Sequence, residues 1–506
     1  MKRLLVCIIF LLPITAWAHS SAVEQIMKMA KEDNRTMEHL DILCNRFGGR
    51  LAGSYACETA EKWAKKCFEE WGYDVKLDKI GDMSVGFSRG GWWGRATGDE
   101  NMVLHFATPS FTSGTKGPQS GHVVLEPLSQ IEFERNKARL KGAWVLIECP
   151  TKVGYALPRG DSKRFVTRRD AILKQNNELA QKQGRYIDRS KMNKSLPCLL
   201  YDQMVEAGVL GFIRSTPAPL NALHDSLVVR RNHTFEMIPT VPDILLDEEQ
   251  FARLHKAASE RRNVQLEFDI RNYFRPGPIP YHNVVAEIKG SKYPDEYVIV
   301  GAHLDAFDVS SGGVDCGNGV AAVMEAARML SVAKAKPERT IIFILFGGEE
   351  FGLLGSKAWI AANKSKLDNV SIMFNRDSGP LPYVGFDVPK SLVEEYEKVA
   401  EPIRQIYPEY NFKIGVAEPM ERPNKPRTAD HYTFRYWGIP ASPLNMADSK
   451  GYGFDYRKVR HTERDDYQRV FPDYEEQSAP VLAIIALGTA NLSKKFPRDE
   501  FFQPAK

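Results

Sequence analysis

The sequence predicts an α/β sandwich with a largely parallel sheet. Residues 280–494 alternate strand-like and helix-like segments, an order that is typical of such sheets. Thr340–Phe346 is a continuous apolar run that ends at two glycines, as expected of a strand buried on both faces. One face of a predicted helix carries the apolar residues Val320, Val323, Met324, Ala327 and Leu330. Together these observations indicate a domain of the α/β class over this segment.

Composition places the chain among globular proteins. It has 506 residues, of which 43% are hydrophobic and 26% charged, and this balance excludes a wholly disordered protein. The 68 basic and 64 acidic residues give a formal net charge of +4. That charge is too small to indicate a nucleic-acid partner, and none is expected.

The first residues are expected to form a targeting segment. Two basic residues precede the apolar run Leu4–Ile14, and Ala16–Ala18 has the small-x-small pattern of a cleavage site. We therefore predict a signal peptide over residues 1–18 and an exported protein, either periplasmic or secreted. No other stretch approaches ~18 consecutive apolar residues, so no stable membrane insertion is expected.

Residues 19–115 lie upstream of the α/β segment and begin with a helical pattern. A helix is predicted from Thr59 to Trp71, with Gly72 as its stop. The stretch 86–115 is rich in Gly, Ser and Thr and has two adjacent tryptophans between glycines. We expect it to be a packed loop.

Residues 116–270 are expected to form a separate module. Short strands are predicted at His122–Leu125, Ala143–Ile147, Val209–Ile213 and Asp243–Leu246. The stretch 158–193 is polar and basic, but interspersed acidic residues favour a solvated helix over a nucleic-acid site. Six cysteines remain after cleavage of the signal peptide, and the sequence leaves their pairing open.

Side chains with metal-ligand chemistry follow the ends of the apolar strands. In chain order they are His303, Asp305, Asp315, Glu349, Glu350 and Asp377, and His461 comes much later. In α/β sheets, sites form at the carboxyl ends of the strands, so we expect these residues to converge. Imidazole and carboxylate ligands suit zinc. Five such ligands exceed the needs of one catalytic zinc and match two ions ~3.5–4 Å apart if one carboxylate bridges them.

Individual roles can be predicted within this set. Asp315 lies on a Gly-rich loop that can approach both ions, so it is the candidate bridge. Glu349 and Glu350 are adjacent at a strand end and point in different directions. One can bind a metal while the other takes a proton from the activated water and passes it to the leaving amine. Asp305 could hold an imidazole in place.

The same residues match the motifs of a known family. The pattern comprises His303–Asp305 as HxD, Asp315 before a helix start, Glu349–Ser356, Asp377–Gly379 and the late His461. Here the chain resembles the co-catalytic zinc exopeptidases, which include secreted bacterial aminopeptidases and carboxypeptidase Q. This resemblance implies a three-layer sandwich with a mixed, largely parallel central sheet, two zinc ions and short peptide substrates.

The resemblance also implies roles and boundaries. It places His303 and Glu350 on one zinc, Asp377 and His461 on the other, Asp315 on both, and Glu349 as the general base. Residues 116–270 resemble an inserted, mainly-β protease-associated domain. The flanking segments 19–115 and 271–506 would then form the catalytic domain.

Substrate contacts and the exact reaction stay open at this point. Asp430 and His431 lie in a segment similar to one near the family's substrate, and Tyr452 lies in a Gly-flanked loop that could cover the site. An aminopeptidase is the leading hypothesis, and a carboxypeptidase Q-like dipeptidase is the alternative. A glutaminyl cyclase with one metal and a non-catalytic receptor-like relative are further alternatives. A homodimer is left open.

Overall fold

The computed structural model describes residues 21–147, 200–220 and 234–504 of the chain. The predicted signal peptide and the basic stretch 158–193 lie outside these residues and stay predictions. Within the described ranges, no helix combines the length and apolar character needed to cross a membrane.

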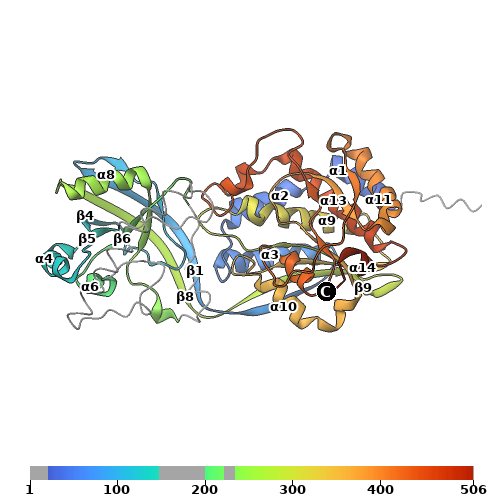
Figure 1. The fold of residues 1–506 in the computed structure, drawn as a ribbon, viewed down its shortest axis with the longest axis horizontal. Helices are drawn as coiled ribbons and strands as arrows, with labels where there is room; N and C mark the ends of the chain where they lie inside the picture. Colours follow the sequence, from blue (N-terminus) through green and yellow to red (C-terminus); the bar gives the residue numbers. More distant parts are fainter. Residues whose placement is uncertain (1–20, 148–199, 221–233, 505–506) are drawn as a thin grey trace, which may run out of the picture.

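Two lobes are joined by a long antiparallel ribbon (Figure 1). The ribbon consists of β1 (Asp74–Gly98) and β8 (Val264–Ile288), which pair along their whole lengths. The larger lobe contains the predicted α/β segment, and the smaller lobe contains the described part of residues 116–270.

The ribbon corrects the loop predicted over 86–115. Trp92 and Trp93 lie in β1, opposite Ile270 and Asp269 of β8. The strand is stabilised by pairing with a segment more than 170 residues away, and a local composition of Gly and Ser gives no sign of such a partner.

The central sheet of the larger lobe is mixed. β9 (Tyr293–His303) lies between β10 (Arg339–Phe346) and β11 (Val370–Asn375) and is parallel to both. β10 pairs antiparallel with β8, and the short β14 (Ala441–Ser442) extends the parallel edge beside β11. A second sheet holds β12 (Tyr383–Val388), β13 (Lys413–Val416) and β15 (Asn445–Met446).

Helices cover both faces of this sheet because alternate side chains of β10 enter different cores. Ile341, Phe343 and Leu345 pack with α9 (Asn318–Val332) and α13 (Pro472–Ala490). The intervening side chains pack with α10 (Leu354–Ala362) and α12 (Asp430–Tyr436). The further helices are α1 (Ser21–Glu32), α2 (Thr36–Asp41), α3 (Tyr55–Glu70), α11 (Val393–Ile406) and α14 (Arg498–Phe501). The predicted three-layer sandwich is thus confirmed.

In the smaller lobe the same sheet continues from the distal half of β8. Its parallel strands are β4 (Gln119–Leu125), β5 (Ala143–Ile147), β6 (Gly211–Thr216) and β7 (Asp243–Asp247), with β3 (Phe106–Ala107) at the edge. Its helices are α4 (Gln130–Leu140), α6 (Tyr201–Glu206) and α8 (Glu248–Ser259). Ala96 and Leu104 belong to this lobe's core, so its packing begins upstream of residue 116.

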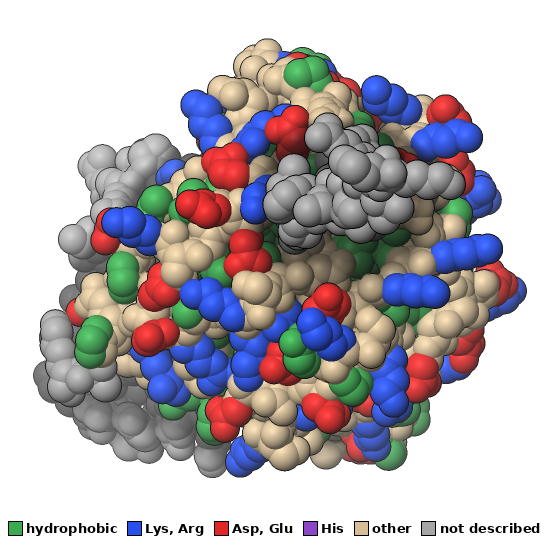
Figure 2. Space-filling model, turned by 90° about the vertical axis from the view of Figure 1, so that its right-hand side faces the viewer, with side chains coloured by type: hydrophobic (Ala, Val, Ile, Leu, Met, Phe, Trp, Pro, Cys, Tyr) green, Lys and Arg blue, Asp and Glu red, His purple; other side chains and the backbone are tan. Residues whose placement is uncertain are grey.

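Charges of both signs are mixed on the end of the larger lobe that Figure 2 shows. Blue and red side chains alternate there without a large single-sign patch. The described cysteines, Cys44, Cys57, Cys67 and Cys316, are free thiols.

Candidate metal centre

Five side chains from separate elements meet at the carboxyl end of the parallel strands. His303 is the last residue of β9, and Glu350 and Asp377 follow β10 and β11. Asp315 lies in the turn Gly313–Gly317 before α9, and His461 comes from the loop that precedes α13. The structure therefore brings together residues that are up to 158 positions apart (461 − 303).

Distances divide the five residues into two groups. His303 Nε2 lies 3.1 Å from Asp315 Oδ1 and 3.7 Å from Asp377 Oδ1. His461 Nε2 lies 3.1 Å from Asp315 Oδ2 and 2.9 Å from Glu350 Oε2. Asp315 faces both imidazoles, one with each carboxylate oxygen, as a bridging ligand would.

This division corrects the pairing that the resemblance implied. Asp377 belongs with His303, and Glu350 belongs with His461. The physical reason is strand order: β11 lies directly beside β9, so the residue that follows β11 reaches the imidazole at the end of β9.

The geometry and the donor chemistry fit a metal. Two ligands about 2.0–2.2 Å from a tetrahedral zinc lie ~3.3 Å apart, which is close to the spacings observed here. Asp315 Oδ2 and Glu350 Oε1 are buried and have no hydrogen-bond partner among the described residues. Buried polar atoms without a partner are unfavourable, and a bound cation would satisfy both.

The pKa values of the two histidines are shifted in the direction that favours their positively charged forms. Burial lowers the pKa of His461, but Glu350 and Asp315 outweigh burial and raise it to about 10. His303 is fully buried, which lowers its pKa, yet Cys316, Asp315 and Asp377 together raise that pKa well above the usual value. The cluster therefore favours cations, and a proton or a metal ion can supply the charge.

Cys316 is a buried neighbour of this cluster rather than a thiolate ligand. Its thiol, His303 and Asp377 are close enough to hold an ion. However, burial raises the pKa of Cys316 to about 12, and its Sγ donates a hydrogen bond of 3.0 Å to the carbonyl of Arg376. A protonated thiol is a poor metal ligand.

Glu349 is the carboxylate beside the cluster that makes no close contact with either imidazole. Burial raises its pKa well above the usual value, and the negative charges of Asp377 and Glu350 add to this effect. A carboxyl group with a raised pKa next to the reacting atoms can accept and return a proton, as a general base must. Its predicted role is consistent with this environment.

Asp305 contacts the predicted imidazole and also holds the turn after β10. Its carboxylate accepts the backbone N–H groups of Glu349 and Glu350, at 3.0 and 3.2 Å. Its main-chain carbonyl lies 2.9 Å from His303 Nδ1, and its Oδ1 lies 3.8 Å from the same nitrogen. Burial raises the pKa of Asp305 to about 6. Asp305 is thus a positioning residue that fixes the turn carrying both glutamates.

Sequence reasoning missed Asp465, which holds the loop of the bridging carboxylate. Asp465 Oδ1 accepts the N–H groups of Val314 and Asp315, at 2.7 and 3.3 Å. Burial, aided by the charge of Asp315, raises the pKa of Asp465 to about 8. No local motif marks this residue, because its role depends on a contact across 150 positions.

The predicted substrate residues Asp430 and His431 lie at the start of α12. Asp430 is fully buried, and burial, together with the charges of Asp377 and Asp305, raises its pKa to about 7. His431 Nδ1 lies 3.3 Å from the side-chain nitrogen of Asn375, and burial lowers the pKa of His431 to about 3. A neutral, enclosed imidazole supports the end of β11.

Tyr452 is held elsewhere by its own loop. Its ring packs 4.7 Å from Phe471 and 4.9 Å from Tyr474, measured between centroids, and its hydroxyl donates to Asp473. The structure does not bring this side chain to the ligand cluster.

A buried ion pair supports the strand end that carries Asp377. Arg376 and Glu475 are fully buried, with 3.2 Å between Nη2 and Oε2. Arg376 also donates to the carbonyl of Leu381 and to Ser478. This pair fastens α13 to the loop after β11.

Replacing Glu475 with Ala should lower the free energy of unfolding by about 3–5 kcal/mol, because it leaves the guanidinium of Arg376 buried without its counter-charge. Urea unfolding measures this loss. The matched control is Glu476→Ala, since Glu476 is exposed on the next position of the helix. Equal stability of the two variants would contradict the prediction.

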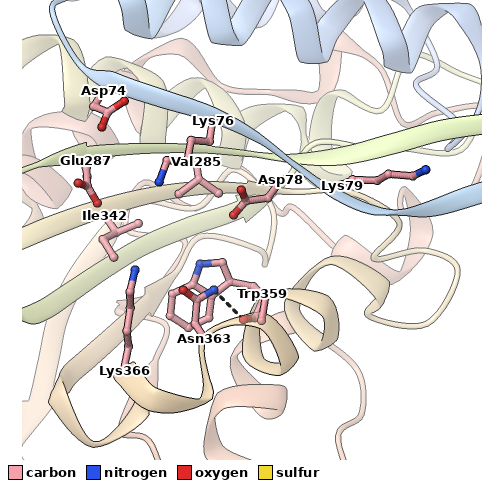
Figure 3. A pocket seen from close by; sticks show the side chains of 11 residues that line it. Asp74, Lys76, Asp78, Lys79, Val285, Glu287, Ile342, Trp359, Asn363 and Lys366 are labelled. Carbon is pink, nitrogen blue, oxygen red and sulfur yellow. Dashed lines mark hydrogen bonds between the residues drawn. The ribbon is translucent and has the colours of Figure 1, made fainter.

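A separate cavity of about 290 Å³ lies between strands β1, β8 and β10 and the end of α10 (Figure 3). Lysine and acidic side chains surround Trp359 there, and Asn363 donates to the carbonyl of Trp359. None of the candidate site residues lines this cavity.

An α/β sandwich with two imidazoles, three ligand carboxylates and a free glutamate at its strand ends defines a metallo-exopeptidase. Residues 283–484 match the family model of Peptidase family M28. The match begins within β8 and includes every candidate ligand.

Relatives extend the similarity to most of the chain. Carboxypeptidase Q of Bos taurus is 27% identical over 427 residues, which cover 80% of this chain and 84% of the relative. The crystal structure of a Peptidase M28 precursor from Shewanella amazonensis superposes with a TM-score of 0.57 at 21% identity, covering 94% and 97% of the two chains. A zinc aminopeptidase from Bacillus subtilis gives a TM-score of 0.52 at 16% identity, covering 93% and 98%. The last two likenesses show the shared fold.

Proposed function

We propose that the chain is a di-zinc exopeptidase that removes amino-terminal residues from short peptides. The observation that carries the proposal is the position of Asp315, whose two carboxylate oxygens face His303 and His461 separately. His303, Asp315 and Asp377 would hold one zinc, and Asp315, Glu350 and His461 would hold the other. The similarity to carboxypeptidase Q and to a zinc aminopeptidase supports zinc and exopeptidase chemistry.

The residues of the chain divide the work of hydrolysis. Bound zinc supplies a Lewis acid that polarises the peptide carbonyl and makes water more acidic. Glu349 takes a proton from the attacking water and returns it to the leaving amine. Asp305 keeps Glu349 and Glu350 in their separate directions by accepting both of their N–H groups. Asp465 holds the backbone of Asp315 in the same way.

A dipeptidase is the second candidate, and Arg460 favours it. Its Nε lies 3.6 Å from Asp315 Oδ2, and its side chain is 32% exposed. The guanidinium carbon lies 5.3 Å from the centroid of Tyr456. A cation at the edge of the ligand cluster could bind the free carboxylate of a short substrate. Hydrolysis of dipeptides with free or blocked carboxyl ends separates the two candidates.

The proposal includes the location of the enzyme, its inserted domain and its partners. The apolar leader before Ala18 supports export to the periplasm or the exterior. The resemblance of residues 116–270 supports an inserted protease-associated domain, and short peptides are the proposed partners.

Removing the metal should abolish hydrolysis. After dialysis against a chelator, we expect no activity on short peptides and full recovery on adding about two equivalents of zinc per chain, because the donor set forms two adjacent sites. Dialysis against chelator already saturated with zinc is the control. Activity that survives chelation would refute the metallopeptidase, and full recovery with one equivalent would refute the second ion.

A further inference from the structure

The loop that carries His461 is attached to the smaller lobe two residues later. The N–H of Glu463 donates to the carbonyl of Leu220 at 2.9 Å, and the N–H of Leu220 donates back to Glu463 Oε1 at 3.0 Å. The other carboxylate oxygen, Oε2, lies 2.8 Å from His105 Nε2. Both partners belong to the smaller lobe, since Leu220 follows β6 and His105 precedes β3.

Apolar packing continues this contact toward the metal centre. Leu220 is 1% exposed and shares a core with Phe307 and Phe351 of the larger lobe. The ring of Phe307 packs against the imidazole of His461, with 4.7 Å between centroids. Burial of Leu220 shelters its hydrogen bonds with Glu463 from water, which makes them stronger than the exposed contact with His105.

The backbone of His461 needs such support. Its φ angle is +57°, in the left-handed region that residues other than glycine seldom adopt. Conformations of this kind persist only where the surrounding structure enforces them. Downstream of His461, Glu463 fastens the loop to the smaller lobe, and Asp465 fastens it to the Asp315 turn.

We propose that Glu463 is a positioning residue through which the smaller lobe fixes His461 in its ligand position. The inference rests on the proposed role of His461 as a metal ligand. It gives the smaller lobe a part in building the metal centre, because its residues hold the loop on which one of the ligands lies.

The test measures zinc binding as well as catalysis. Glu463→Ala should weaken binding of the less tightly held zinc about 10–100-fold and lower kcat in the same range, as loss of an outer partner of a ligand does. KM should change little. Glu463→Gln should recover most of both losses, because an amide oxygen can still accept the N–H of Leu220. Competition with a chromogenic chelator gives the zinc affinity, and the visible spectrum of the cobalt form reports the ligand geometry.

A double-mutant cycle tests the contact between Glu463 and His105 of the smaller lobe. His105→Ala should weaken zinc binding about twofold to fivefold, as expected of an exposed pair. In the Glu463→Ala background the same change should have no further effect. Glu267→Ala is the matched control, since Glu267 pairs with Arg95 within the smaller lobe and far from the loop.

Three results would overturn the inference: wild-type zinc affinity and kcat in Glu463→Ala, an additive effect of His105→Ala, or an equal loss in Glu267→Ala. A wild-type chain that binds no zinc would refute the proposed function instead, so the two failures are distinguishable.

Discussion

Glu349→Gln should lower kcat by about 10²–10⁴-fold and leave both zinc ions bound. The amide has nearly the same shape but cannot take a proton from water. Asp305 accepts the backbone N–H groups of the turn, so the substitution should not disturb Glu350. Steady-state kinetics combined with metal analysis of the purified variant measures both quantities.

The neighbouring substitution provides the contrast. Glu350→Gln should lose zinc affinity together with kcat, since Glu350 Oε2 faces His461. Glu397→Gln, at a surface pair with Arg404, should behave as the wild type. A Glu349→Gln enzyme with full activity, or one that lacks zinc, would show that the assignment of the base is wrong.

Asp315→Asn should weaken both metal sites at once. Its two oxygens lie 3.1 Å from different imidazoles, so one lost charge affects both ions. Activity should fall by more than about 100-fold, which is the loss expected when a hydrogen-bond partner of a metal ligand is removed. Zinc titration followed by calorimetry measures the affinity of each site.

Single-site variants separate bridging from ordinary ligation. His303→Ala and His461→Ala should each weaken one site more than the other, whereas Asp315→Asn should weaken the two sites together. Asp82→Asn, at an exposed pair with Lys79, is the control. If Asp315→Asn left one site at wild-type affinity, the bridge would be refuted.

The prediction from sequence was most successful where the signal is local. Apolar runs such as Thr340–Phe346 and Val370–Phe374 became buried strands because a strand buried on both faces needs uninterrupted hydrophobicity. It was weakest along β1, whose Gly-rich second half is stabilised by its partner β8 and not by its own propensity.

The candidate site shows the same contrast between local signals, which the sequence displays, and long-range contacts, which it does not. The ligand types and their order along the chain were evident, since three of the five ligands lie at or just after the end of an apolar strand. Asp465 and Glu463 were missed because their partners lie 150 and more residues away. Asp305 was predicted to hold an imidazole, and its carbonyl does lie 2.9 Å from His303 Nδ1. Its hydrogen bonds to the turn after β10 were missed, because they join segments 44 and 45 positions apart.

The amino-acid sequence by itself determined the α/β class, the kind of chemistry and the residues able to hold a metal, because hydrophobic periodicity and side-chain donors are properties of short segments. Only the tertiary structure decided which carboxylate belongs with which histidine, what holds the glutamate turn, and how the smaller lobe reaches the His461 loop. Those answers depend on strand order and on contacts between distant segments, and the packing of the whole chain sets both.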